Sequence, residues 1–228
     1  MALKLTPSAQ DYLKVIYALE AIQEPPRRAT VSTSAISHRM GVSAASGTNM
    51  LKKLDSMGLV DYVPYRGASL TEAGRKVALE VVRHHRLIET YLSEALGVPW
   101  DEIHDEAEIL EHALSEELED RISAHLGHPT ADPHGHPIPA KDGSLPERAP
   151  RPRRLWDVGE GESASVATVP DSEAEALRYL AELGLTPGTR VEVVGRGPVG
   201  GPLFVRLMRG DPEVRALSRE LAESVWVA

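Results

Sequence analysis

Apolar positions in the first third of the chain recur with roughly the 3.6-residue period of amphipathic helices. The predicted helices cover residues 8–21, 33–40 and 44–57. A tight turn at 41–43 separates the second helix from the third, and residues 59–70 then form two short strands around a turn at 64–67. Helix, turn, helix and β-hairpin is the order of a winged helix-turn-helix, and the pattern predicts that domain here.

The next segment is predicted to be helical, and the tail is predicted to be a small β-barrel. A long helix begins at Thr71 and runs to about Leu96, and a further helix spans about 102–126. Residues 127–152 are rich in Pro, Gly and His, which indicates a linker or an extended strap and not a packed element. Short strands then alternate around one helix at 172–183, which is typical of a small barrel that carries a helix.

The net charge of −9 is distributed unevenly along the chain. Residues 1–70 carry eight Lys and Arg against five Asp and Glu, whereas residues 71–128 carry five against fourteen. The distribution of charge, and not its total, decides where phosphates can bind. The first segment is therefore the only sizeable folded stretch that is expected to attract a DNA duplex.

Composition excludes several classes of protein. The chain has no cysteine, which excludes disulfides, thiolate zinc sites and iron–sulfur clusters and fits a reducing compartment. Its first 20 residues lack the apolar core of a signal peptide, and no stretch approaches the roughly 20 apolar residues of a membrane span. We therefore expect a soluble, cytoplasmic protein with no membrane partner.

Six potential metal ligands lie on two neighbouring predicted helices. On the 102–126 helix four of them occupy positions i, i+4, i+7 and i+8, within an arc of about 100° on one helix face. These four are His104, Glu108, Glu111 and His112. On the preceding helix, His85 and Glu89 repeat the i, i+4 spacing. Clustered carboxylates repel one another unless a cation neutralises them, so the pattern predicts a metal site, with a solvated acidic face as the alternative.

The remaining histidines of this region are not expected to be ligands, because they lie at a helix end or in the predicted linker. They are His125, His128, His134 and His136.

The predicted helix-turn-helix carries the residue types that read DNA. Gly41 permits the turn, and Ser, Thr and Asn side chains can reach base edges while Lys and Arg hold phosphates. The candidate DNA contacts are Ser43, Ala45, Ser46, Thr48, Asn49, Lys52 and, at the tip of the wing, Arg66. A polar solvent face on an ordinary helical hairpin is the alternative interpretation.

Five stretches make the chain resemble the diphtheria toxin repressor family of iron- and manganese-dependent transcription regulators. They are DYLKVIYALE at 11–20, MGVSAASGTNMLKKLDSMGLV at 40–60, LTEAGRKVA at 70–78, RHHRLIETYL at 83–92 and HDEAEILEHALSEELE at 104–119. The resemblance extends over essentially the whole chain, and the two stretches with potential ligands are its most specific part.

The resemblance implies a mainly α fold with small β parts, a homodimer and a palindromic operator in double-stranded DNA. The implied divisions are a winged helix-turn-helix domain at 1–72, a helical metal-binding and dimerisation domain at 73–140, a linker at 141–154 and an SH3-like domain at 155–228.

The resemblance also implies two metal sites. One joins the N-terminal helix to the dimerisation domain and matches Asp11, Glu108, Glu111 and His112. The second, ancillary site matches His85, Glu89 and His104, completed from the third domain. Glu173 falls near the position of one such third-domain ligand, with Glu175 as the alternative.

Iron-type relatives have sulfur ligands where this chain has Asp11 and Glu108. Carboxylates make a harder site, which favours Mn²⁺ over softer ions, with Fe²⁺ as the alternative ion. The expected function is thus manganese-dependent regulation of transcription by a DNA-binding protein, not an enzyme, and the resemblance implies repression of metal-uptake genes.

Two rival functions belong to other classes. The His and Glu cluster would suit a dinuclear metallohydrolase, although no Gly-rich or substrate-binding loop lies near those helices. A regulator that binds a small organic effector is the third hypothesis. Metal-stimulated binding to a duplex without turnover would separate the three.

Overall fold

The computed structural model describes residues 5–22, 30–146, 152–208 and 213–228. They fall into two compact units: an N-terminal unit of Met1–His84 with Pro139–Ser144, and a C-terminal unit of His85–Ile138 with Leu145–Ala228. Across the described ranges, no helix combines the length and the apolar character needed to cross a membrane.

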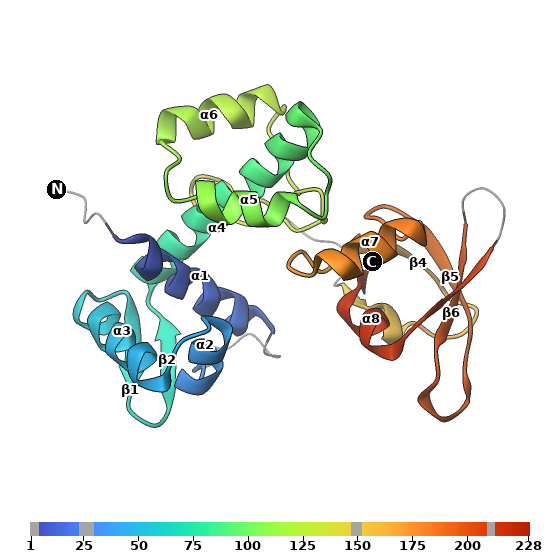
Figure 1. Ribbon diagram of the computed structural model, residues 1–228, viewed down its shortest axis with the longest axis horizontal. Coiled ribbons are helices and arrows are strands. Elements are labelled where there is room, and N and C mark those ends of the chain that lie inside the picture. The colour runs from blue at the N-terminus through green and yellow to red at the C-terminus, as the bar shows by residue number, and fades with distance from the viewer. Residues whose placement is uncertain (1–4, 23–29, 147–151, 209–212) are drawn as a thin grey trace. The chain divides into compact units, whose positions relative to one another are not determined.

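The N-terminal unit is a winged helix-turn-helix, as predicted (Figure 1). Its elements are α1 (Pro7–Ile22), α2 (Thr33–Arg39), α3 (Ala44–Ser56), β1 (Val60–Val63), β2 (Gly67–Leu70) and the first half of α4 (Glu72–Leu96). The antiparallel pair β1–β2 forms the wing. Apolar side chains from all three short helices are fully buried in one core, which includes Leu13, Ile36 and Leu51. Burial of one face of each helix therefore fixes α3 against its neighbours.

Two serines and a glycine set the geometry of the helix-turn-helix. The Ser32 and Ser43 side chains accept hydrogen bonds from the N–H groups of the first turns of α2 and α3, which satisfies donors that a helix start leaves unpaired. A Cβ built on Gly47 would lie 2.1 Å from Ser37 Oγ. A larger residue at position 47 would force the Ser37 side chain to move, so glycine suits the close approach of α2 and α3.

Glu20 ties α1 to the wing and to α4. The Leu70 N–H donates a 2.8 Å hydrogen bond to Glu20 Oε1 in a buried setting, and the Arg75 guanidinium pairs with Glu20 Oε2. The same guanidinium lies over the Tyr17 ring, 5.6 Å from its centroid. One carboxylate thereby orients three elements of this unit.

We expect Glu20→Ala to destabilise the protein by about 2–3 kcal/mol, because it leaves the buried Leu70 N–H without an acceptor. Urea unfolding would measure this as a lower midpoint. Glu20→Gln keeps an acceptor oxygen and should lose clearly less. Equal losses in the two variants would contradict the role of the buried hydrogen bond.

The helix predicted at 102–126 is two helices, α5 (Ile103–Leu110) and α6 (Glu116–His125), so that prediction was wrong. Ser115 breaks the segment because its side chain accepts a hydrogen bond from the Leu118 N–H and caps α6. Acidic residues in the first turn of α6 further favour a helix start there. Consequently Glu111 and His112 lie beyond the end of α5 and do not continue the helix face that carries the other ligand candidates.

The segment after α6 is packed, which corrects the expectation of an unpacked linker. Asp132 Oδ1 accepts hydrogen bonds from the N–H groups of His134 and His136, each at 2.9 Å, and folds the chain into a tight turn. His134 and Ile138 are buried. Arg86 on α4 donates to the Pro137 carbonyl at 2.5 Å and holds the turn against the helix.

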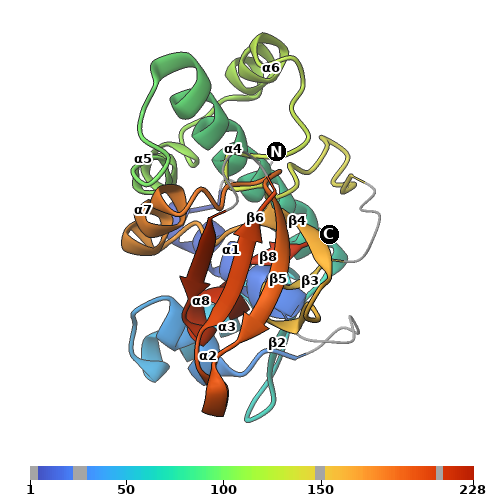
Figure 2. The ribbon, with the colours of Figure 1, turned by 90° about the vertical axis from the view of Figure 1, so that its right-hand side faces the viewer.

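The tail forms a six-stranded sheet with helices beside it (Figure 2). Its elements are β3 (Arg153–Arg154), β4 (Ser163–Thr168), α7 (Ala174–Glu182), β5 (Arg190–Arg196), β6 (Leu203–Leu207), β7 (Val214–Leu217), α8 (Arg219–Ser224) and β8 (Trp226–Val227), with short 3₁₀ turns at Leu155–Asp157 and Pro198–Gly200. The strand order is β3-β8-β4-β5-β6-β7. Leu177 and Leu180 of α7 are fully buried against this sheet. The pattern of the sequence revealed neither β7 nor α8.

Candidate metal centre and DNA-binding surface

His85 lies at the centre of a buried group of potential ligands. Its Nδ1 is 2.5 Å from Glu111 Oε2, and its Nε2 is 3.0 Å from Glu89 Oε1 and 3.2 Å from His104 Nδ1. The i, i+4 spacing of His85 and Glu89 on α4 brings them together as the sequence predicts. The imidazole therefore lies between two carboxylates that come from different elements.

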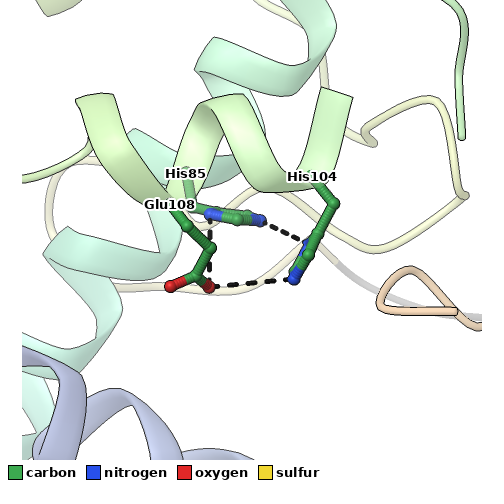
Figure 3. Close-up of side chains that lie close together, drawn as sticks. All are labelled: His85, His104 and Glu108. Atoms are coloured by element: carbon green, nitrogen blue, oxygen red, sulfur yellow. Dashed lines mark hydrogen bonds and ion pairs between the residues drawn. The ribbon is translucent and has the colours of Figure 1, made fainter. Parts of the chain in front are cut away.

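Glu108 faces the same group (Figure 3). Its Oε1 is 3.9 Å from His85 Nδ1 and 3.9 Å from His104 Nε2. His85, His104 and Glu108 each offer one ligand atom, and these atoms lie within 4.8 Å of one another. The resemblance assigned Glu108 to the first site, whereas its neighbours here are two residues assigned to the ancillary site.

His134 joins this group from the packed turn, although the sequence analysis did not expect it to be a ligand. Its Nδ1 is 3.7 Å from Glu89 Oε1, and its Nε2 is 2.9 Å from the Trp100 carbonyl oxygen. The carbonyl can only accept, so Nε2 carries a proton and donates it to Trp100. Metal-bound histidines are usually oriented in this way by a second hydrogen bond to a carbonyl or carboxylate.

A second group of potential ligands adjoins the first. Asp132, His134 and His136 offer atoms within 4.8 Å of one another. His136 Nδ1 is 3.5 Å from Asp132 Oδ2 and 3.7 Å from Oδ2 of Asp171, which follows β4 in the tail. Arg86 Nε, 3.6 Å from Asp132 Oδ2, is the nearby cation. The sequence signal that could have revealed this group is the run Asp-Pro-His-Gly-His at 132–136.

Electrostatics in the cluster favour ionised carboxylates. Burial by itself raises the pKa of Glu89, but interactions with His104, His134 and His85 outweigh it and hold that pKa well below its ordinary value. Burial also acts to raise the pKa of Asp171, but the charge of His136 outweighs this effect and the pKa is lowered. The pKa of His134 is raised, because its interactions with Glu89 outweigh the effect of burial. These carboxylates are therefore charged at neutral pH, as metal ligands must be.

The cluster also contains ligand atoms that the protein itself does not satisfy. Among the described residues, buried atoms of the cluster without a hydrogen-bond partner include Glu89 Oε2, Asp132 Oδ2, His134 Nδ1 and His136 Nδ1. Buried polar atoms are normally paired, and such exceptions need an explanation. Oxygen and imidazole nitrogen are the donors that divalent manganese and iron accept, so the residues present fit a metal ion.

The remaining predicted ligands are placed as follows. Glu173 and Glu175 are exposed. The tail carboxylate that contacts the cluster is that of Asp171, through His136. A ligand role for Glu173 stays a prediction. His112 Nε2 is 3.6 Å from Glu111 Oε1. Asp11 lies on α1 in the N-terminal unit, and the site that would join it to these two residues also stays a prediction.

The candidate DNA contacts lie mostly on the exposed side of α3 and at the wing tip. Ser43, Ala45, Ser46, Asn49, Lys52 and Arg66 are exposed. The Ser43 hydroxyl is already used, because it caps α3 and lies 3.0 Å from the Ser46 hydroxyl. Thr48 is half-buried and donates to the Ala44 carbonyl at 2.8 Å. Asn49 and Lys52 therefore present the freest polar groups among the predicted contacts of α3.

Three family models match the chain and together cover most of it. Residues 4–68 match the N-terminal DNA-binding domain of iron-dependent repressors, residues 71–140 match their metal-binding and dimerisation domain, and residues 153–228 match the FeoA domain.

Whole-length comparisons agree with the family models. The iron-dependent repressor IdeR of Mycobacterium tuberculosis is 32% identical over 98% of both chains, and the diphtheria toxin repressor of Corynebacterium efficiens is 33% identical over 83% of this chain and 84% of its own. A structure described as a manganese-dependent transcriptional repressor in complex with manganese is 41% identical, covers 96% of this chain and 99% of its own, and superposes with a TM-score of 0.88. The structure of the manganese regulator SloR is 31% identical, covers 98% and 99%, and has a TM-score of 0.76.

These similarities confirm the winged-helix and SH3-like fold and give no support to the metallohydrolase hypothesis. The chain matches both a DNA-binding domain and a dimerisation domain. The partners of this protein are therefore DNA and a second copy of the chain. The chain belongs to the iron-dependent repressor family of metal-dependent, DNA-binding transcriptional repressors, whose members are not enzymes.

Proposed function

We propose that this protein is a manganese-responsive repressor that binds a palindromic operator as a homodimer in the cytoplasm and controls genes for metal uptake. The observation that carries the metal assignment is the set of buried oxygen and nitrogen atoms in the two adjoining groups of potential ligands that lack hydrogen-bond partners among the described residues. A cation bound in such a group would neutralise its carboxylates and be held by its unpaired atoms.

The ligand types support Mn²⁺ over the softer divalent ions. Every candidate ligand is a carboxylate or an imidazole, and the chain has no cysteine. Affinity rises generally from Mn²⁺ through Fe²⁺ to Co²⁺, so selection of manganese has to come from ligand hardness and geometry. Two of the similar structures are described as manganese regulators, which supports the same choice, and Fe²⁺ is the alternative ion.

The proposed mechanism is a coupling between metal binding and the position of the DNA-reading domain. Asp11 on α1 would share an ion with Glu111 and His112, which follow α5, and this ion would restrain the recognition helices of a dimer at about one DNA turn, roughly 34 Å apart. The ion must bind the DNA-competent arrangement more tightly than the others, or it shifts no equilibrium.

The direct test is a fluorescence-anisotropy titration. The probe is a labelled duplex selected by the wild-type protein from a random-sequence pool in the presence of Mn²⁺. Binding should be strong with Mn²⁺, weaker or absent with Zn²⁺ and absent with a chelator, and Fe²⁺ is compared under anaerobic conditions. Equal binding with the chelator and with Mn²⁺ would exclude the proposal.

Asn49→Ala should weaken binding to the selected duplex by about 5- to 100-fold, because an amide that contacts a base contributes roughly 1–3 kcal/mol. Lys52→Ala and Arg66→Ala should instead weaken binding to all duplexes and reduce the salt dependence. Anisotropy with the selected and a scrambled duplex at several salt concentrations separates the two effects. Normal discrimination by the Asn49→Ala protein would show that Asn49 does not read a base.

A further inference from the structure

The tip of the wing holds a tyrosine in a backbone conformation that favours glycine. The Arg66 N–H donates to the Val63 carbonyl at 3.0 Å, so residues 63–66 form a β-turn with Pro64 at its second position. Tyr65, at the third position, has φ +66°. Proline cannot adopt the positive φ that a type I′ turn requires, so the turn is type II, in which Gly or Asn normally occupies the third position.

Nothing within the described parts of the chain explains why that position holds a large aromatic residue. The Tyr65 side chain is fully exposed, at 107% of its reference area. It takes part in none of the hydrogen bonds or ring contacts found among the described residues. The left-handed conformation is unfavourable for a side chain with a Cβ, and here no packing offsets that cost.

The position of the turn relative to α3 indicates what Tyr65 contacts. The Tyr62 N–H of β1 donates to Asp55 Oδ1 near the end of α3 at 3.0 Å, and β1 pairs with β2 up to Val63 and Gly67. The hairpin is thus attached to the recognition helix. A duplex that binds α3 therefore lies close to the hairpin as well, and Arg66, next to Tyr65 at its tip, is expected to hold a phosphate.

We propose that Tyr65 contacts the operator duplex through its ring, which packs against the deoxyribose wall of the groove next to the one that α3 occupies. This contact rests on the proposed role of α3 as the recognition helix. The strained turn holds the backbone of an exposed aromatic residue at the tip of the wing, directly beside Arg66.

Val199 provides a matched comparison within the same chain. It also has a positive φ, +55°, and is also fully exposed, but it lies in a turn of the tail flanked by glycine. Strain and exposure alone therefore do not identify a DNA contact. What distinguishes Tyr65 is its attachment to α3 and its cationic neighbour.

The experiment combines stability and DNA affinity, because the proposal expects them to change in opposite directions. Tyr65→Gly should raise the melting temperature by about 2–4 °C, since glycine relieves the turn, and should weaken binding to the selected duplex by about 3- to 10-fold. Tyr65→Phe keeps the ring and should bind close to wild type. Val199→Gly should raise the melting temperature similarly and leave DNA binding unchanged.

A Tyr65→Gly protein that gains stability and loses DNA affinity supports the contact, and any other combination overturns it. Wild-type binding with Mn²⁺ in the same titration tests the proposed function. A wild type that does not bind overturns both proposals, whereas normal wild-type binding with undiminished binding by Tyr65→Gly overturns the contact alone.

Discussion

DNA binding by a Glu111→Ala protein is expected to lose its response to Mn²⁺. Glu111 is 1% exposed, and its Oε2 lies 2.5 Å from His85 Nδ1. Its carboxylate is a candidate ligand of the site with Asp11 and His112. It also orients His85, a candidate ligand of the ancillary site. Loss of an orienting partner alone typically lowers metal affinity about 10- to 100-fold, and loss of a ligand should lower it further.

Anisotropy of the selected duplex against free Mn²⁺ measures this response. Glu106→Ala is the control, because Glu106 is an exposed carboxylate on α5 and should respond like wild type. Glu111→Gln preserves the shape of the side chain and separates loss of the ligand from loss of the fold. A folded Glu111→Ala protein that still responded fully to Mn²⁺ would remove Glu111 from the switch.

The N-terminal unit could be predicted because local signals fix its elements. Short amphipathic helices, a turn around Gly41 and a proline-initiated hairpin each have a signature within a few residues. The pattern of the sequence does not reveal the break between α5 and α6, although Ser115 is a local cap signal. The helical spacing of the potential ligands favours one continuous helix over a break at Ser115. It therefore places Glu111 and His112 on a helix face that, in the structure, ends before them.

The potential ligands in the packed turn could not be predicted in the same way. His134 lies in a Pro- and Gly-rich run, which is usually exposed, and its burial depends on Trp100 and α4, 34 and more residues away. Asp171 reaches the cluster because the tail contributes to the same compact unit. Spacing along the chain carries no information about such contacts. The i, i+4 pair His85 and Glu89 was predictable because a single helix presents both.

The second large effect is expected from replacement of His134, whose place in a Pro- and Gly-rich run does not predict a ligand. Its Nδ1 is buried without a hydrogen-bond partner and lies 3.7 Å from Glu89 Oε1, while the Trp100 carbonyl fixes the other ring nitrogen. If an ion binds at Glu89, removing this nitrogen should lower the affinity of that site for Mn²⁺ by about 10- to 100-fold or more. Calorimetric titration of the metal-free variant with Mn²⁺ should show that one class of sites binds the ion more weakly than in the wild type.

His134→Phe is the variant that best isolates the ligand. It retains a ring of similar size at a fully buried position, next to the Trp100 ring whose centroid is 5.7 Å from that of His134, and it removes both nitrogens. His125→Ala is the control, because His125 is an exposed histidine that belongs to neither group of potential ligands. The metal response of DNA binding should change less in His134→Phe than in Glu111→Ala, since the site joining Asp11 to Glu111 and His112 stays complete. Unchanged Mn²⁺ stoichiometry and affinity in a folded His134→Phe protein would show that His134 is a structural histidine held by Trp100.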